Sequence, residues 1–236
     1  MANILESLSK VQSGDVVMSV RDIKRTFVEG GQPLHILRGG GFDLHRGEII
    51  ALVGQSGSGK STLLQCVGLL DKPTAGSIII GGASVQKMDE DMRTKIRRNK
   101  IGFVYQKHNL LGDFTALENV VLPMLANGVD DATANARAMK LLRAANVAHR
   151  ASHRPGEMSG GEQQRTAVAR ALANNPDILL ADEPTGSLDP QHATAVFDLL
   201  MDLVRKNKMA MLFVTHDMNL AQRADRKITI DNGIVL

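Results

Sequence analysis

Residues Gly54-Gln-Ser-Gly57-Ser-Gly59-Lys60-Ser61-Thr62 decide the fold of this 236-residue chain. They follow the apolar stretch 49–53 and precede the helical apolar stretch 63–67. This order of strand, glycine-rich loop and helix is the context in which a G-x-x-x-x-G-K-[ST] motif binds phosphate. Glycine lets the backbone wind closely around phosphate oxygens, and the N-terminus of the following helix favours an anion. The stretch therefore predicts a triphosphate-binding loop in an α/β protein; the alternative, a surface loop, is disfavoured by the flanking elements.

The residues of this loop have separate expected roles. Lys60 is expected to reach the β- and γ-phosphates, and Ser61 to place its hydroxyl on Mg²⁺. The other residues expected to bind the nucleotide here are Gly54, Gln55, Ser56, Gly57, Ser58, Gly59 and Thr62.

Composition indicates an ordinary globular protein. Hydrophobic residues make up 43% of the chain and charged residues 22%, which argues against disorder and low-complexity sequence. The single cysteine cannot form an internal disulfide, which favours a reducing, intracellular compartment. No apolar run is long enough to span a bilayer, and the N-terminus lacks the pattern of a secretion signal, so we expect a cytoplasmic protein. A net charge of +3 only weakly favours an anionic partner.

Short apolar runs alternate with longer stretches of helical periodicity, which is typical of an α/β protein with a mainly parallel sheet. Strands are expected at 16–20, 48–53, 77–80, 101–105, 178–181, 211–215 and 227–230. Helices are expected at 60–70, 89–98, 133–145, 161–172 and 190–206. Residues 1–15 are polar and weakly patterned, so we expect a loosely held extension before a domain at 16–236. Within that domain a mostly helical insertion predicts a helical subdomain at about 107–158.

Two acidic residues follow the apolar run 178–181. Asp182 is suited to positioning Mg²⁺. Glu183 is placed to polarise a water that attacks the γ-phosphate. The alternative is that the two acids merely begin a turn before Pro184, and the phosphate loop makes that alternative weaker.

The stretch Met158-Ser-Gly-Gly-Glu162-Gln-Gln-Arg165 separates the classes of triphosphatase. It resembles the signature sequence of ATP-binding cassette (ABC) ATPases, normally Leu-Ser-Gly-Gly-Gln. Met158 and Glu162 depart from that wording, but the Ser-Gly-Gly core is intact. A GTPase is disfavoured because the Asn-Lys pair at 207–208 lacks the acid that would recognise guanine.

The resemblance covers residues 16–236 and implies a P-loop NTPase (RecA-like) core, an N-terminal antiparallel β subdomain and a helical subdomain. It implies catalysis by Glu183, His216 and Lys60, with ATP and Mg²⁺ as cofactors. The metal ligands it implies are Ser61, Gln106 and Asp182. Beyond the phosphate loop, the nucleotide-binding residues it implies are Phe27, Gln106, Ser159, Gly160, Gly161 and Asp189. Phe27 takes the place of a tyrosine that stacks on adenine in this family, and a core role is the alternative.

The family pairs two cassettes head to tail, so the resemblance implies a homodimer. The segment Ser159–Gly161 of one copy would cap the γ-phosphate held by the loop at Lys60 of the other. The interval between Lys60 and Ser159 is too short for the long coiled coils of chromosome-maintenance ATPases, and the chain has one cassette. A transporter subunit is therefore expected, docked on two integral membrane subunits through the helical subdomain.

A finer resemblance lies outside these motifs. The stretch 113–120 with Leu122-Pro123 resembles cassettes that serve lipoprotein release, macrolide export and the cell-division ABC complex. The stretch His149-Arg-Ala-Ser-His153-Arg-Pro155 is closer to the lipoprotein-releasing members. This implies a peripheral protein on the cytoplasmic face of the inner membrane that drives release of outer-membrane-directed lipoproteins. Macrolide export and cell division are the alternatives within the group.

A soluble nucleic-acid-associated ABC ATPase is the alternative from another class. The basic cluster 93–100 favours it, but acids at 89–91 precede the cluster. Acids in the first turn and cations in the last complement a helix dipole, so an exposed helix explains the pattern without nucleic acid. We therefore expect no nucleic-acid partner.

Three glycines, Gly39-Gly40-Gly41, stand where the family has strand-favouring residues before Phe42. Glycine in a strand interior weakens it, so we expect loosened β structure here.

Overall fold

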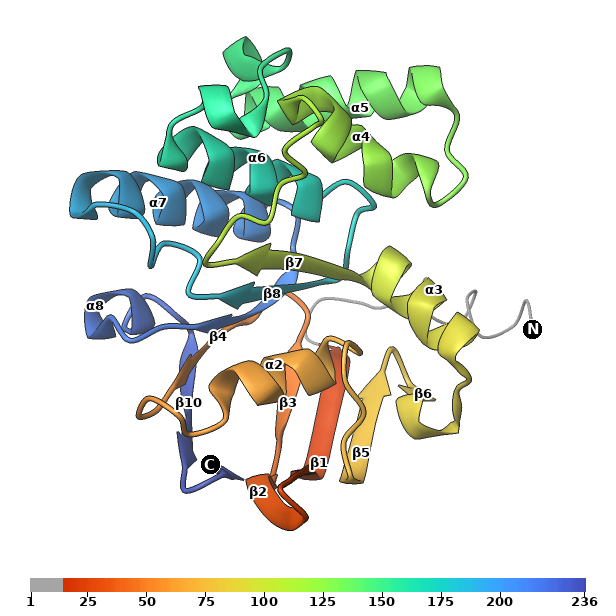
Figure 1. The fold of residues 1–236 in the computed structure, drawn as a ribbon, viewed down its shortest axis with the longest axis vertical. Coiled ribbons are helices and arrows are strands. Elements are labelled where there is room, and N and C mark those ends of the chain that lie inside the picture. The colour runs from red at the N-terminus through yellow and green to blue at the C-terminus, as the bar shows by residue number, and fades with distance from the viewer. Residues whose placement is uncertain (1–14) are drawn as a thin grey trace. The chain divides into compact units, whose positions relative to one another are not determined.

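The computed structural model describes residues 15–236, so the predicted N-terminal extension lies outside the described residues except at its end. The chain divides into two compact units. The first contains the described residues up to Arg97 together with Lys208–Leu236, and the second is Arg98–Asn207. Both units combine strands with helices, which confirms the α/β class (Figure 1). Within the described range, no helix has both the length and the apolar character needed to cross a membrane.

The sheet of the first unit joins an antiparallel and a parallel part. Its strand order is β6 (Ala83–Ser84), β5 (Ala75–Ile80), β1 (Val16–Glu29), β2 (Gln32–Gly40), β11 (Ile234–Val235), β10 (Arg226–Asp231), β4 (Ile49–Val53) and β9 (Ala210–Val214). Strand β3 (Phe42–His45) pairs with β1. Strands β10, β4 and β9 are parallel, whereas β1 pairs antiparallel with β2, β3 and β5. The predicted antiparallel N-terminal part next to a parallel core is therefore confirmed.

Strand β4 is the central element of the parallel part. Ile49, Ile50, Ala51 and Leu52 are all fully buried. A parallel strand covered on both faces reads as a continuous apolar run, which is why this strand was predictable. Helix α2 (Lys60–Val67) follows it and ends earlier than predicted, at Gly68. Leu69 then adopts a left-handed conformation with φ of 61°.

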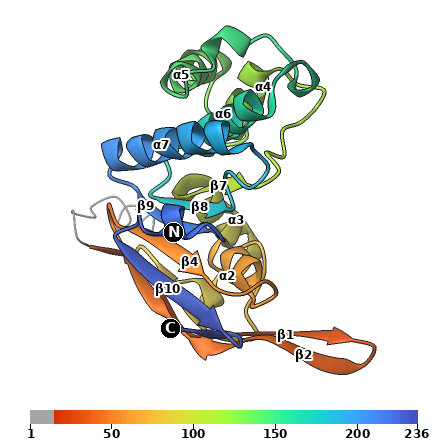
Figure 2. The ribbon, with the colours of Figure 1, turned by 90° about the vertical axis from the view of Figure 1, so that its left-hand side faces the viewer.

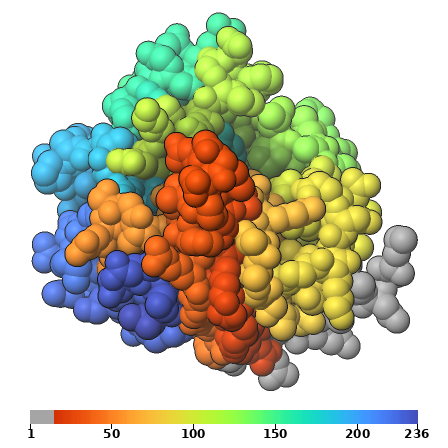
Figure 3. All heavy atoms as spheres, turned by 60° about the horizontal axis from the view of Figure 1, so that its bottom comes forward, coloured from red at the N-terminus to blue at the C-terminus, as the bar shows by residue number. Residues whose placement is uncertain are grey.

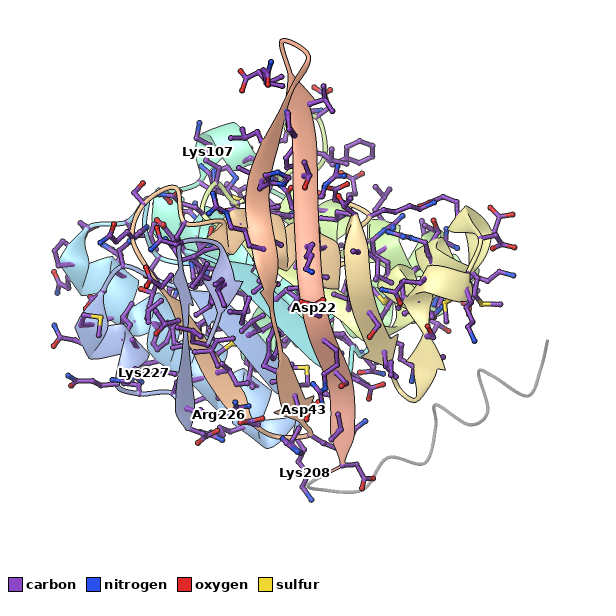
Figure 4. All side chains as sticks on the ribbon, turned by 90° about the horizontal axis from the view of Figure 1, so that it is seen from below. Asp22, Asp43, Lys107, Lys208, Arg226 and Lys227 are labelled. Carbon is purple, nitrogen blue, oxygen red and sulfur yellow. The ribbon has the colours of Figure 1, made fainter. Side chains whose placement is uncertain are left out.

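Strand β1 is much longer than the predicted 16–20 and forms a hairpin with β2. Figure 2 shows the hairpin extending from the rest of this unit's sheet, and Figure 3 shows its residues at the surface. The turn uses Gly30 and Gly31, both with positive φ, as tight hairpins prefer. At the opposite end of the sheet the backbone oxygen of Asp43 accepts a hydrogen bond from Arg226 at 2.6 Å (Figure 4).

The glycines 39–41 do not loosen the sheet, so that prediction is wrong. Strand β2 continues through Gly40, which pairs with Val235 of β11. A Cβ atom on Gly40 would lie 2.0 Å from the backbone oxygen of Val235, and one on Gly41 would lie 2.0 Å from that of Val20. Neighbouring backbones approach so closely here that only glycine fits.

The basic cluster belongs to helix α3 (Glu90–Lys100), which follows the short 3₁₀ helix η1 (Val85–Lys87). Acidic residues occupy its first turn as predicted. The interpretation as a wholly exposed helix is wrong at Arg93, which is only 3% exposed. Its guanidinium donates to the backbone oxygens of Leu69 (3.2 Å) and Asp71 (3.1 Å). Arg93 therefore holds the turn that follows α2.

The second unit contains two parallel strands and most of the helices. Strands β7 (Ile101–Tyr105) and β8 (Ile178–Asp182) pair in parallel. The helices are α4 (Ala116–Leu125), α5 (Asp131–Ala144), α6 (Gly160–Ala171) and α7 (Pro190–Lys206), with 3₁₀ turns η2 (Ala148–Arg150) and η3 (Pro155–Glu157). Helices α4, α5 and α6 share an apolar core that includes Val120, Leu142 and Met158 (Figure 1). The predicted subdomain limits of 107–158 stay a prediction. In the first unit, α8 (Met218–Ala221) follows β9.

Candidate nucleotide-binding site

The loop between β4 and α2 is shaped by its glycines and by Lys60. Gly57 and Gly59 have φ of 77° and 104°, a region that L-residues seldom adopt. Lys60 is 6% exposed, and its ammonium donates to the backbone oxygens of Gly54 (2.9 Å) and Gln55 (2.7 Å). The cation is thus held inside the loop that the sequence predicts to bind phosphate.

Two further features of this loop fit a triphosphate. The hydroxyl of Ser58 is buried and has no hydrogen-bond partner within residues 15–236, although a buried polar group is normally satisfied. Beside the loop lies a pocket of about 310 Å³, lined by residues 34–36, 38, 55–58 and 230–233 of the first unit. The loop thus combines the buried cation of Lys60, the unsatisfied hydroxyl of Ser58 and glycines with positive φ. Together these suit an anionic ligand that supplies hydrogen-bond acceptors.

Phe27 lies on β1 opposite Leu34 of β2. Its side chain is among the exposed apolar groups, with 36% of its surface accessible, so the alternative of a buried core role does not hold. The guanidinium of Arg25 lies 4.2 Å from the ring centroid and also donates to Asp71 at 2.7 Å. Phe27 is therefore a surface ring packed against the guanidinium of Arg25. Its stacking on adenine stays a prediction.

His216 follows strand β9 and is exposed. Strand β9 pairs in parallel with β4, and Val214 lies opposite Leu52. Because the carboxyl ends of parallel strands meet at one edge of a sheet, the phosphate loop and His216 both lie at that edge of the first unit's sheet. The structure thus brings these two predicted elements together.

In the second unit, Gln106 and Glu183 also leave parallel strands at one edge. Tyr105 of β7 pairs with Asp182 of β8, and the two residues follow directly. A Cβ atom on Gly186 would lie 2.9 Å from Nε2 of Gln106 and 3.0 Å from Oε2 of Glu183. Both side chains therefore converge on the space that this glycine leaves open.

Glu183 has a strained backbone. Its φ is 45°, and its carbonyl accepts the N–H of Gly186 at 2.9 Å in a tight turn. A left-handed conformation costs an L-residue about 1–2 kcal/mol. Such outliers cluster at functional sites, so the strain points to a constraint on where this carboxylate lies.

The signature segment begins helix α6. Ser159 is the N-cap: its hydroxyl accepts the N–H of Glu162, and Oε2 of Glu162 accepts the N–H of Ser159 at 2.8 Å. This capping box leaves Ser159 and Gly160 exposed at the helix N-terminus, a favourable place for an anion. Gly161 is close to His192 of α7, because a Cβ atom on it would lie 3.4 Å from that ring.

Asp189 has a structural task that the sequence did not reveal. It is the N-cap of α7, where its carboxylate accepts the N–H of His192 and lies 2.7 Å from that residue's Nδ1. The backbone N–H of His192 lowers the pKa of Asp189 below its ordinary value. Any contact of this residue with nucleotide would be additional to the cap.

Sequence reasoning missed Gln164. It is 1% exposed, and its Nε2 donates to the backbone oxygens of Tyr105 (2.9 Å) and Pro184 (2.7 Å). Ser187 adds a second link by donating to the backbone oxygen of Gln106 at 2.8 Å. The signature helix and the loops after β7 and β8 are therefore tied together. The available signal was the helical spacing of Gln164 from the apolar residues Ala167, Val168 and Ala171, which places it on the buried face of α6.

The predicted site residues fall in both units. The first unit holds Phe27, Lys60, Ser61 and His216, and the second holds Gln106, Ser159, Asp182, Glu183 and Asp189. Among the described residues, no three His, Cys, Asp or Glu side chains are grouped to hold a metal. The predicted ligands Ser61, Gln106 and Asp182 all offer oxygen donors, the type that Mg²⁺ prefers.

Comparison with known proteins gives concordant matches. The family model described as ABC transporter matches residues 37–186. The lipoprotein-releasing system ATP-binding protein LolD 1 of Rhodospirillum rubrum is 52% identical over 91% of this chain and 95% of its own length. LolD of Novosphingobium aromaticivorans is 50% identical over 94% and 99%, respectively. A dimeric post-hydrolysis structure of the ATP-binding cassette MJ0796, bound to ADP and Pi, has a TM-score of 0.85 and 40% identity, covering 92% of this chain and 96% of that one.

Proposed function

Because this chain belongs to the ABC transporter family and is an ATP-hydrolysing cassette of it, we propose that it powers the release of lipoproteins from a membrane. The observation that carries this proposal is the 52% identity to a lipoprotein-releasing ATP-binding protein over 95% of that protein's length. The similarity therefore extends through the helical part of the second unit, well beyond the shared phosphate loop.

The proposed chemistry is in-line attack of water on the γ-phosphate. Lys60 leaves its two carbonyl partners in the loop and donates to the phosphates, where Ser58 gains the partner it lacks. Glu183 polarises the attacking water, and His216 stabilises the charge that develops on the γ-phosphate. Ser61, Gln106 and Asp182 would hold Mg²⁺, which would supply positive charge to offset that of the phosphates.

The proposed assembly is a pair of cassettes beneath two integral membrane subunits. The exposed N-terminus of α6 supports it, because Ser159 and Gly160 lie at the surface where the positive end of the helix dipole favours the γ-phosphate of a second copy. The dimeric cassette MJ0796 is a precedent for such a pair. The proposed place of work is the cytoplasmic face of the inner membrane, without a nucleic-acid partner.

Reconstitution tests the proposal. The cassette is purified with its membrane subunits, placed in proteoliposomes loaded with an acylated lipoprotein, and supplied with ATP. We expect lipoprotein to appear in the soluble fraction, and we expect a Glu183→Gln complex to release none. Export of a macrolide without lipoprotein release would favour a related transporter. Hydrolysis stimulated by DNA or RNA, with steep salt dependence, would favour a nucleic-acid-associated ATPase.

A further inference from the structure

The stretch His149–Pro155 stands out in the sequence but has no part in the chemistry above. In the structure its side chains reach the signature helix. Nε of Arg150 donates to Oε1 of Glu162 at 2.7 Å, and Nε2 of His149 lies 3.2 Å from the same oxygen. Nη1 of Arg150 also lies 3.2 Å from Nε2 of His153. The guanidinium of Arg150 is therefore held by Glu162 through one nitrogen and by His153 through another.

Glu162 divides its two oxygens between two tasks. Oε2 accepts the backbone N–H of Ser159 and closes the capping box, and Oε1 accepts Arg150. Its side chain is 19% exposed, so solvent screens the pair only in part. The hydrogen bond from Arg150, followed by that from Ser159, lowers the pKa of Glu162 to about 2. The side chain is an anion throughout the neutral range.

This anion creates an electrostatic problem for the proposed dimer. Glu162 stands one turn from Ser159, the residue proposed to face a triphosphate, and the usual residue at this place is a neutral glutamine. An uncompensated carboxylate here would repel the incoming phosphates. The guanidinium of Arg150 supplies the opposite charge at the carboxylate oxygen that the capping box leaves available.

We propose that Arg150 is a positioning residue for the signature segment. Through Glu162 it fixes the backbone of Ser159, and it cancels the negative charge that would oppose the γ-phosphate of a second copy. This inference rests on the proposed function, because it assumes that Ser159 caps a triphosphate. It assigns the stretch 149–155 a task in ATP-driven pairing of cassettes rather than in hydrolysis itself.

A charge-rescue series tests the proposal. Arg150→Gln, Glu162→Gln and the double variant are compared in the full complex by KM for ATP and kcat. Loss of Arg150 alone leaves an unpaired anion, so we expect KM to rise about tenfold with kcat changed less. Glu162→Gln keeps an acceptor oxygen for the capping box and removes the charge. Glu162→Gln alone, and the double variant, are therefore expected to stay within about twofold of the wild type in KM.

The rescue separates this role from a merely structural one. If the double variant is as impaired as Arg150→Gln, or if Arg150→Gln has no effect, the proposal is overturned. Arg154→Gln is the matched control, because it removes an exposed cation from the same stretch without touching Glu162, and we expect wild-type KM. Ser159→Ala tests the capping role of Ser159 separately from the positioning role of Arg150. An unchanged KM in Ser159→Ala would remove the proposed capping role itself, whereas impairment there with a normal Arg150→Gln would remove only the role of Arg150.

Discussion

At the scale of single residues, the end of β8 shows how backbone shape and chemistry are joined. Glu183 keeps a left-handed backbone that favours glycine, and Gly186 lacks the side chain that would displace its neighbours. Local sequence revealed Asp182 and Glu183 because a buried strand ended in acids. It did not reveal Gly186 or Gln164, because their importance comes from contacts with Tyr105 and Gln106, far away in the chain.

Replacing Glu183 with glutamine is expected to lower ATP turnover by about 10²–10⁴, the usual contribution of a general base. The amide is nearly isosteric, so ATP affinity should stay close to that of the wild type. Phosphate release and calorimetry measure the two quantities. Turnover equal to the wild type would show that another group activates the water.

Replacing Gly186 with alanine is expected to lower turnover about 100-fold, because a displacement of about 1 Å in a positioned group has such an effect. The added Cβ would meet Gln106 at 2.9 Å and Glu183 at 3.0 Å. Gly112→Ala is the control, since nothing lies within 4 Å of its Cβ position. Equal turnover in both variants, at equal melting temperature, would contradict the steric argument.

Cys66 is expected to resist thiol reagents in the native protein. It is fully buried, and burial raises its pKa to about 12, so the reactive thiolate is scarce at pH 8. The reaction should become fast in guanidinium chloride, where the thiol regains its ordinary pKa. Stopped-flow labelling of this single cysteine measures both rates, and rapid labelling without denaturant would show that α2 opens locally.

At the scale of elements, local patterns were sufficient where one element buries a whole face. Strand β7 and helix α7 have the predicted limits. Strand β11 was missed because its two residues are ordered only by pairing with β2 and β10, which lie elsewhere in the chain. Helix α4 was missed because Pro123 stands inside it. A capping box at Thr115 and Glu118 starts this helix, and burial of Val120 and Met124 stabilises it despite the proline.

Two glycines with positive φ, Gly40 at the end of β2 and Gly82 between β5 and β6, give a stability prediction. Gly40→Ala should destabilise the protein more than Gly82→Ala, although both positions have nearly the same φ, 82° and 84°. Gly82 has open space around its Cβ position, so alanine there costs only the conformational strain of about 1–2 kcal/mol. At Gly40 the clash with Val235 should add about 1–3 kcal/mol. Chemical denaturation measures both, and equal losses would show that the sheet relaxes.

At the scale of the whole molecule, the site is divided between two units of the chain. The phosphate loop and His216 belong to one unit, and the proposed water-activating carboxylate and the signature segment to the other. Short motifs are read from local sequence, so each half was predictable. The nucleotide and the second copy that we propose to complete the site are not encoded by any local pattern.

ATP is therefore expected to drive dimerisation when hydrolysis is blocked. Glu183→Gln should sediment as a dimer with ATP and as a monomer without it. Lys60→Ala combined with Glu183→Gln should stay monomeric, because the loop loses the cation that holds the phosphates. Removing Mg²⁺ with a chelator should stop hydrolysis in the wild type. A monomer under every condition would contradict the paired arrangement.

The two hydrogen bonds of Gln164 have a mechanical consequence. The amide nitrogen of Gln164 donates both of its hydrogens, one to the backbone oxygen of Tyr105 at the end of β7 and one to that of Pro184 in the loop after β8. Displacement of either segment would therefore break a hydrogen bond of a side chain that is only 1% exposed, or would move α6 with it. Gln164 thus couples the ends of β7 and β8 to the signature helix through a single side chain.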